Sequence, residues 1–191
     1  MLSPNFASFP ETVTARLLLR KVRMEDAIEI LKLRSDEKVM QFIEKDRAAG
    51  IADAEIFIRR IFQSLQDNEG ITWAITLKEE PDVLIGTIGY WRLIKEHYRA
   101  EIGYMLNPVQ WNKGIMKEAL RKVVEYGFNE LNLHSIEAHI NPDNEASTTI
   151  LTSTGFVKEA HFKEDFLYKG VFRDTVVYSR LRHYQGSNLP I

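Results

Sequence analysis

The sequence lacks cysteine, and it has few features that point to a membrane or to nucleic acid. Without cysteine there is no disulfide, no thiolate nucleophile and no cysteine-ligated metal site. No apolar run is long enough to span a bilayer and no signal peptide opens the chain, so we expect a cytoplasmic protein without a membrane partner. The 25 basic residues nearly balance the 27 acidic ones, which disfavours a general nucleic-acid surface. The five histidines show no ligand spacing, so we expect no metal.

The composition is that of an ordinary globular protein. Hydrophobic residues make up 45% of the 191 and charged residues 27%, which is enough to build a sizeable core. We expect one domain over residues 1–191, with a core of about 12–183 and a loosely held tail at 185–191.

Residues 98–131 are the most informative stretch. Ala100–Leu106 has the alternation of a strand, and Asn107-Pro108 ends it. A loop containing Gly114 then leads into a helix, whose apolar residues recur at the helical period from 115 to 128. The N–H groups at such a helix start can bind a phosphate or pyrophosphate, although an ordinary strand-to-helix turn has the same pattern. The loop matches neither a Walker A sequence nor a dinucleotide-binding fingerprint.

The remaining pattern predicts a mixed α/β (α+β) domain with the order β-α-α-β-β-β-α-β-α-β-β. Glycines 86 and 89 are read as close-packing or bulge positions. The expected strands are Thr14–Arg20, Ile71–Leu77, Val83–Trp91, Ala100–Leu106, His134–Ile140, Val157–Tyr168 and Val171–Leu181, the last two joined at Lys169-Gly170. The other expected helices lie near residues 27–33, 52–65 and 144–153, the last capped by Asp143 or Asn144 and ended by Gly155.

This order, together with short motifs, resembles the GNAT superfamily of acetyl-CoA-dependent N-acetyltransferases, and within it the ribosomal-protein N-terminal acetyltransferases of RimJ/RimL type. The resemblance runs from Thr14 to about Leu181. The matching segments are Thr14–Arg20, Ala100–Tyr104, Trp111–Ala119, Ile136–Ala138, Asn141–Ser147, Gly155-Phe156, and Gly170 with Asp174, Tyr178 and Ser179.

The resemblance implies a bent sheet whose fourth and fifth strands, 99–106 and 134–140, splay apart. The pantetheine arm of acetyl-CoA would lie in that V, and the N–H groups of residues 112–117 would cradle the pyrophosphate. No metal is implied. The cofactor-binding residues carried over are Tyr104, Met105, Leu106, Asn112, Lys113, Gly114, Ile115, Met116, Lys117, Asn141 and Asn144. Asn112 departs from the family loop, which usually has glycine there.

Acetyl transfer needs a neutral amine. At pH 7, deprotonating an α-amino group costs roughly 1.4 kcal/mol and a lysine roughly 4.6 kcal/mol, so an N-terminal amine asks less of a base. Glu101 resembles the strand glutamate that some relatives use as base, although it may be read as a structural carboxylate instead. Glu137 is an alternative base, and Glu164 and Asp165 could also reach the substrate.

The usual family acid, a tyrosine four residues before the Gly-Phe glycine, is replaced by Leu151. Ser147 resembles a serine proposed for that role in the RimL-like group, and it can also be read as a structural hydroxyl. The simplest donor to the oxyanion is the Met105 N–H.

These residues favour an acetyl-CoA-dependent N-acetyltransferase acting on a primary amine, with a protein N-terminus as the first choice. A polyamine or antibiotic acetyltransferase is the second reading, in which carboxylates at positions 44, 46, 53 and 55 would supply an acidic pocket. A non-catalytic acyl-CoA sensor is the third. The sequence leaves open the acceptor, other acyl donors and a homodimer.

Overall fold

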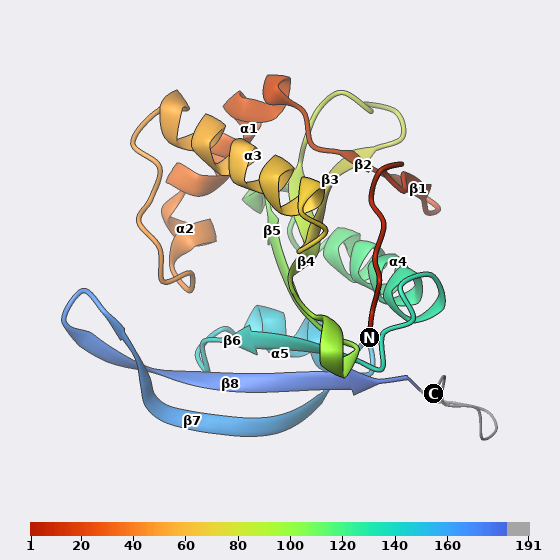
Figure 1. The fold of residues 1–191 in the computed structure, drawn as a ribbon. Helices are drawn as coiled ribbons and strands as arrows, with labels where there is room; N and C mark the ends of the chain where they lie inside the picture. Colours follow the sequence, from red (N-terminus) through yellow and green to blue (C-terminus); the bar gives the residue numbers. More distant parts are fainter. Residues whose placement is uncertain (183–191) are drawn as a thin grey trace.

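The structure, a computed structural model, describes residues 1–182. These residues form a single eight-stranded sheet flanked by helices (Figure 1). The strands are β1 Thr12–Val13, β2 Leu17–Lys21, β3 Ile71–Leu77, β4 Gly86–Ile94, β5 Arg99–Leu106, β6 Ser135–Ile140, β7 Val157–Tyr168 and β8 Val171–Leu181. The α-helices are α1 Ala27–Ser35, α2 Glu37–Met40, α3 Ile51–Gln66, α4 Ile115–Asn129 and α5 Glu145–Thr152, with short 3-10 helices at Met24–Asp26, Lys95–His97 and Pro108–Gln110. Within residues 1–182, no helix is both long enough and apolar enough to cross a membrane.

The expected mixed α/β fold and element order are confirmed, with β1 and α2 as additions. Two predicted strands were misplaced. The first begins at Leu17 and not at Thr14, because residues 14–16 turn between β1 and β2. The third runs over 86–94 and not 83–91, because residues 81–83 belong to the preceding turn. His183 and the predicted tail lie outside the described residues.

Helices cover both faces of the sheet, and each face has its own core (Figure 1). On one face α1 and α3 pack through residues such as Ile30 and Ile58. On the other face α4 and α5 pack against the longer strands through residues such as Leu120 and Leu151. Helix α4 therefore buries the apolar stripe that its sequence predicted.

The sheet opens at its one parallel pair. β5 and β6 are paired only at residues 99–101 with 135–137, and beyond that point they diverge, as Figure 1 shows. A β-bulge in β4, between Tyr90 and Arg92, lies opposite the last paired residues of β5 and increases the local twist. The predicted splay between the fourth and fifth expected strands is thus present. It leaves one edge of residues 102–106 without a partner strand.

The remaining turns follow simple stereochemistry. Lys169 and Gly170 both have positive φ, at 49° and 77°, which is the geometry of a two-residue hairpin turn and joins β7 to β8 as predicted. A Cβ on Gly89 would lie 2.2 Å from the carbonyl oxygen of Ile71, so the prediction of a close-packing glycine is confirmed there.

Candidate active site

The loop before α4 has the geometry of an anion-binding nest. Asn112 and Gly114 both adopt the left-handed conformation, with φ of 59° and 74°. Asparagine tolerates this conformation better than most residues, which explains how it can stand where glycine is usual. Among the described residues, the N–H groups of 112–117 donate to no turn, loop or side-chain acceptor. They therefore point a cluster of free donors, at the positive end of α4, toward any bound phosphate.

A clamp from the start of the chain holds this loop in place. The Glu118 carboxylate accepts hydrogen bonds from Thr14 Oγ1, from the Arg16 N–H and from Arg16 Nε, the last at 2.8 Å. Arg16 Nη1 also donates to the carbonyl oxygen of Lys113, at 2.9 Å. These bonds lower the pKa of Glu118 although burial opposes them. The clamp occupies the loop's carbonyl oxygen at Lys113 and leaves its N–H groups free.

Strand β5 presents backbone groups to the open V. The Asn107 N–H donates to Ile85 of the turn before β4, and the Tyr98 carbonyl accepts from Ser135 of β6. Backbone direction alternates along a strand, so the amides of Tyr104 and Leu106 face the V and the amide of Met105 faces β4. The prediction that the Met105 N–H stabilises the oxyanion is therefore wrong, because that N–H points toward β4. The Tyr104 N–H is the donor on the open side.

A cavity of about 510 Å³ joins the loop to the V. Ten of the predicted residues line it: Tyr104, Met105, Leu106, Asn112, Gly114, Ile115, Met116, Lys117, Asn144 and Ser147. Its lining is completed by residues 38–43 of α2 and the segment after it, by Gln110 and Trp111, and by the outer face of α5. A continuous cavity with phosphate donors at one end and free strand amides beside it fits an extended acyl-CoA molecule.

Helix α5 brings the amide side chain of its cap, Asn144, and the hydroxyl residue Ser147 to this cavity, and it buries Leu151. Asn144 caps the helix, and its Oδ1 accepts from the Ser147 N–H at 3.0 Å, as expected for one of the two predicted caps. Ser147 itself is 8% exposed. Leu151, which stands where relatives have their acid, is fully buried in the core and offers no proton.

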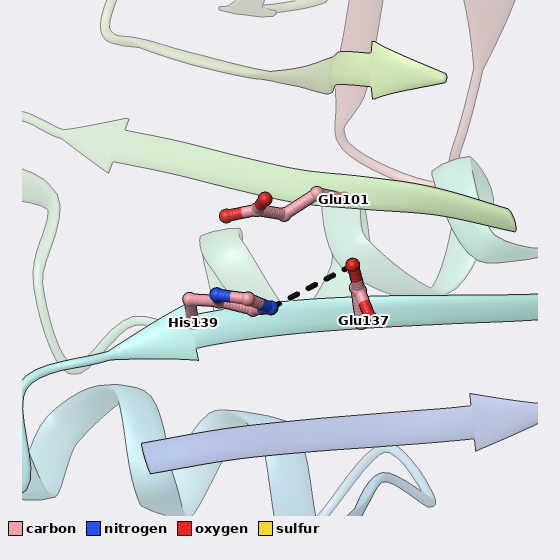
Figure 2. Close-up of side chains that lie close together, drawn as sticks. All are labelled: Glu101, Glu137 and His139. Carbon is pink, nitrogen blue, oxygen red and sulfur yellow. Dashed lines mark ion pairs between the residues drawn. The ribbon is translucent and has the colours of Figure 1, made fainter. Parts of the chain in front are cut away.

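At the vertex of the V, two buried glutamates face each other. Glu101 of β5 and Glu137 of β6 are paired in register, each is 6% exposed, and His139 lies on the same side of β6 (Figure 2). One ligand-type atom from each of the three lies within 4.8 Å of the others. Arg99 pairs with Glu137, and His139 Nε2 is 3.6 Å from Glu137 Oε1. The nearest cation to Glu101 is Arg92, at 3.9 Å and half-exposed.

The two carboxylates differ in how well they are compensated. Burial, and then the charge of Glu137, raise the pKa of Glu101 from 4.5 to about 7, and Arg92 and Trp91 only partly oppose this. A carboxylate whose pKa is near 7 is suited to general-base catalysis at neutral pH. Glu137 is held by Arg99, and it acts on Glu101 as a fixed neighbouring charge.

Some predicted residues lie away from this site. Lys113 does not line the cavity, and its side chain bonds Gln110. Asn141 also lies outside the lining, and it contacts Glu44 and the Asp143 N–H. Glu164 and Asp165 are exposed in β7 on the projecting hairpin. None of the carboxylates at 44, 46, 53 and 55 lines the cavity, and Asp46 pairs instead with Lys169 at 2.8 Å.

Sequence reasoning did not identify the wall that Lys38, Val39, Gln41, Phe42 and Ile43 form along the cavity. No periodicity or motif in that segment indicates that it folds over β5. It also missed the clamp at Glu118, since a helix-surface glutamate four residues after a glycine carries no distinctive signal.

Comparison with known proteins gives consistent results over most of the chain. The family model described as an acetyltransferase (GNAT) domain matches residues 16–157. The "Uncharacterized N-acetyltransferase YoaA" of Bacillus subtilis is 37% identical over 90% of this chain and 96% of its own. A GNAT-family acetyltransferase from Bacillus anthracis superposes with a TM-score of 0.80 at 28% identity, over 90% of this chain and 98% of that one.

More distant matches carry different acceptors in their names. A spermidine N(1)-acetyltransferase of Vibrio cholerae is 23% identical over 85% of this chain and 91% of its own. A ribosomal-protein-S5-alanine acetyltransferase structure from Vibrio fischeri has a TM-score of 0.78 at 24% identity, over 90% of this chain and 96% of that one. At such identity the structural likeness supports the fold alone.

Proposed function

Because the chain belongs to the GNAT family and is an acetyl-CoA-dependent N-acetyltransferase, we propose that its acceptor is the α-amino group at a protein N-terminus, as in the RimJ/RimL type. The observation that carries this proposal is the buried Glu101, whose pKa is raised to about 7. Such a base lies within about one pKa unit of an α-amine but more than three below a lysine or polyamine amine. Proton transfer from an α-amine to Glu101 is therefore only slightly uphill. Because the chain is an acetyltransferase, we set aside the third interpretation, a non-catalytic acyl-CoA sensor.

Each group in the site has a defined task in this proposal. The N–H groups of residues 112–117 bind the diphosphate, and the open amides of Tyr104 and Leu106 hold the arm. Acetyl-CoA supplies an activated acyl group as a thioester. Glu101 accepts the proton of the incoming amine, and the Tyr104 N–H stabilises charge on the acyl oxygen. Ser147 lines the same cavity, and in this proposal its hydroxyl donates to the departing sulfur.

Glu137 adds a second carboxylate at the point where the amine reacts. Its position beside Glu101 makes the vertex attractive to a cationic ammonium group before it loses its proton (Figure 2). Glu137 keeps Glu101 a stronger base than an isolated glutamate. The same acidic vertex is the one observation that favours the second candidate function, acetylation of a polyamine.

A panel of acceptors separates the two candidates. We would measure thiol release from acetyl-CoA with free N-terminal peptides, with the same peptides blocked at the N-terminus but carrying lysine, and with spermidine, spermine and an aminoglycoside. Mass spectrometry would locate the acetyl group. We expect turnover with the free peptides alone. Turnover with spermidine exceeding that with every peptide would replace the proposal by the polyamine reading.

A further inference from the structure

The hydroxyl of Tyr104 is the one buried side-chain polar atom, among residues 1–182, that has no hydrogen-bond partner. The side chain lies on the face of β5 that packs against α4 and α5, and it lines the cavity together with Ser147. Ser147 is close enough to favour the ionised form of the hydroxyl, yet no bond of ordinary geometry joins the two.

Two other buried aromatic donors among residues 1–182 are satisfied. The Tyr90 hydroxyl donates to the Val123 carbonyl at 2.8 Å, and the Trp73 indole N–H donates to the Pro10 carbonyl at 2.8 Å. A buried hydroxyl without a partner costs about 1–3 kcal/mol. Tyr104 is the exception and belongs to the cavity lining, so a group that binds in the cavity can supply the missing partner.

The position of Tyr104 narrows the identity of that group. The phosphate donors lie beyond the Leu106 end of β5, and the base Glu101 lies at the other end, at the vertex of the V. A pantetheine arm that runs from the phosphate donors to Glu101 brings its thioester end past Tyr104. Leu151, at the place where the resemblance implies a tyrosine acid, is buried and apolar, and the hydroxyl residues of α5 that line the cavity are Ser147 and Thr149.

We propose that the Tyr104 hydroxyl donates a hydrogen bond to the sulfur of coenzyme A as the thioester bond breaks, and so takes over leaving-group stabilisation from the missing tyrosine of α5. This inference rests on the acetyl transfer set out above. It adds a catalytic residue that the sequence motifs do not indicate. Tyr104 lies on β5, whereas the tyrosine that it replaces would lie on α5.

The proton balance of this step is simple. Glu101 accepts the proton that the amine loses, and the C–S bond breaks with its electron pair going to sulfur. Burial raises the pKa of Tyr104 to about 12, well above that of a thiol at about 8.5, so Tyr104 keeps its proton and acts as a donor only. The departing thiolate is protonated by solvent after release. Hydrogen bonds to a charged group are the stronger kind, so the contact favours the state in which charge has reached sulfur.

The test compares coenzyme A with desulfo-coenzyme A, which carries hydrogen in place of the thiol. Binding of both would be measured by calorimetry at pH 9, where much of the thiol is ionised, for the natural protein and for Tyr104→Phe. We expect the natural protein to prefer coenzyme A, and the variant to lose that preference by roughly tenfold to a hundredfold. The ultraviolet absorbance of the bound thiolate should titrate at higher pH in the variant. We also expect kcat to fall while KM for acetyl-CoA changes little.

Tyr126→Phe is the matched control, because it removes a half-buried hydroxyl from α4 at a distance from the cavity lining. It should leave the preference for coenzyme A unchanged. The Tyr104→Phe variant should fold, since it deletes only an unsatisfied hydroxyl, and its melting temperature checks this.

Equal weakening of both ligands by Tyr104→Phe would show that the hydroxyl binds the arm and not the sulfur, and would overturn the inference while leaving the proposed acceptor untouched. No effect on either ligand would overturn it as well. Absence of coenzyme A binding by the natural protein would instead remove the acetyl-transfer proposal on which the inference rests.

Discussion

Two pairs of buried charged side chains, Arg20 with Asp26 and Glu101 with Glu137, differ in what surrounds them. Arg20 and Asp26 are almost fully buried and joined by two hydrogen bonds of 2.9 and 2.7 Å, and Arg20 also donates to carbonyls of the turn before β4. Glu101 and Glu137 are just as buried but carry the same charge. The first pair is compensated within the chain. The second is left partly uncompensated at the vertex of the V, where we propose that the amine loses its proton.

The contrast shows how burial can serve stability in one region and reactivity in another. A compensated pair contributes little beyond a well-defined geometry, and it becomes costly only when one partner is removed. An uncompensated carboxylate has its pKa moved toward the working pH, which costs stability but supplies a base. Four experiments test this comparison.

Replacing Arg20 should give the largest effect on stability. Arg20→Met leaves Asp26 buried without its partner, and we expect the free energy of unfolding to fall by about 3–5 kcal/mol. Urea denaturation measures this. Arg23→Ala, which breaks an exposed pair with Asp82, is the control and should cost under about 1 kcal/mol. A comparable loss in both variants would contradict the structural role given to Arg20.

Replacing Glu101 should give the largest effect on rate. Glu101→Gln removes the base, and we expect kcat/KM for the amine to fall by about 10²–10⁴-fold, measured by thiol release. Glu125→Gln makes the same change on the exposed surface of α4 and should be silent. If Glu101→Gln retained most of its rate with an unchanged pH profile, Glu101 would be a structural carboxylate.

The same variant should be more stable than the natural protein at high pH. Folding raises the pKa of Glu101 from 4.5 to about 7, so the native state holds this proton more tightly than the unfolded chain. Its contribution is fully present below pH 4.5 and is lost as the pH rises through 7. At pH 8.5 we expect the free energy of unfolding of Glu101→Gln, measured by urea denaturation, to exceed that of the natural protein by up to about 3 kcal/mol. At pH 4 the two proteins should differ little. A larger stability difference at pH 4 than at pH 8.5 would contradict the raised pKa of Glu101.

Removing Arg92 should give the smallest effect. Arg92 lowers the pKa of Glu101 from a half-exposed position 3.9 Å away, so Arg92→Ala should move the rising limb of the pH–rate profile upward by well under one pH unit. Arg59→Ala on α3 is the control, since it breaks an exposed pair with Glu55. A downward shift in Arg92→Ala would mean that Arg92 does not act on Glu101 through its charge.

Local features of this chain could be predicted from its sequence because local physics determines them. The apolar period of α4, the turn at Lys169-Gly170 and the cap at Asn144 all follow from a few neighbouring residues. The free donors before α4 were also predictable, since they depend on backbone conformation more than on side chains.

The long-range features could not be predicted in the same way. Glu101 and Glu137 meet through a parallel register between strands 36 positions apart, which no local pattern encodes. The direction of the Met105 amide depends on the register between β4 and β5. The orphan hydroxyl of Tyr104 and the wall at residues 38–43 depend on how whole elements pack. The sequence motifs indicated the region of the candidate site but not which of its atoms meet.

The contact between Arg16 and Lys113 spans 97 positions of the chain. The loop that we propose to hold the nucleotide end of the cofactor therefore has its shape maintained by a surface turn near the N-terminus. Ranking residues by their distance from the reacting acetyl group would place Arg16 and Thr14 near the bottom. Inherited variation or laboratory selection at those two positions should nevertheless alter affinity for coenzyme A, and a search for such effects confined to the V would overlook them.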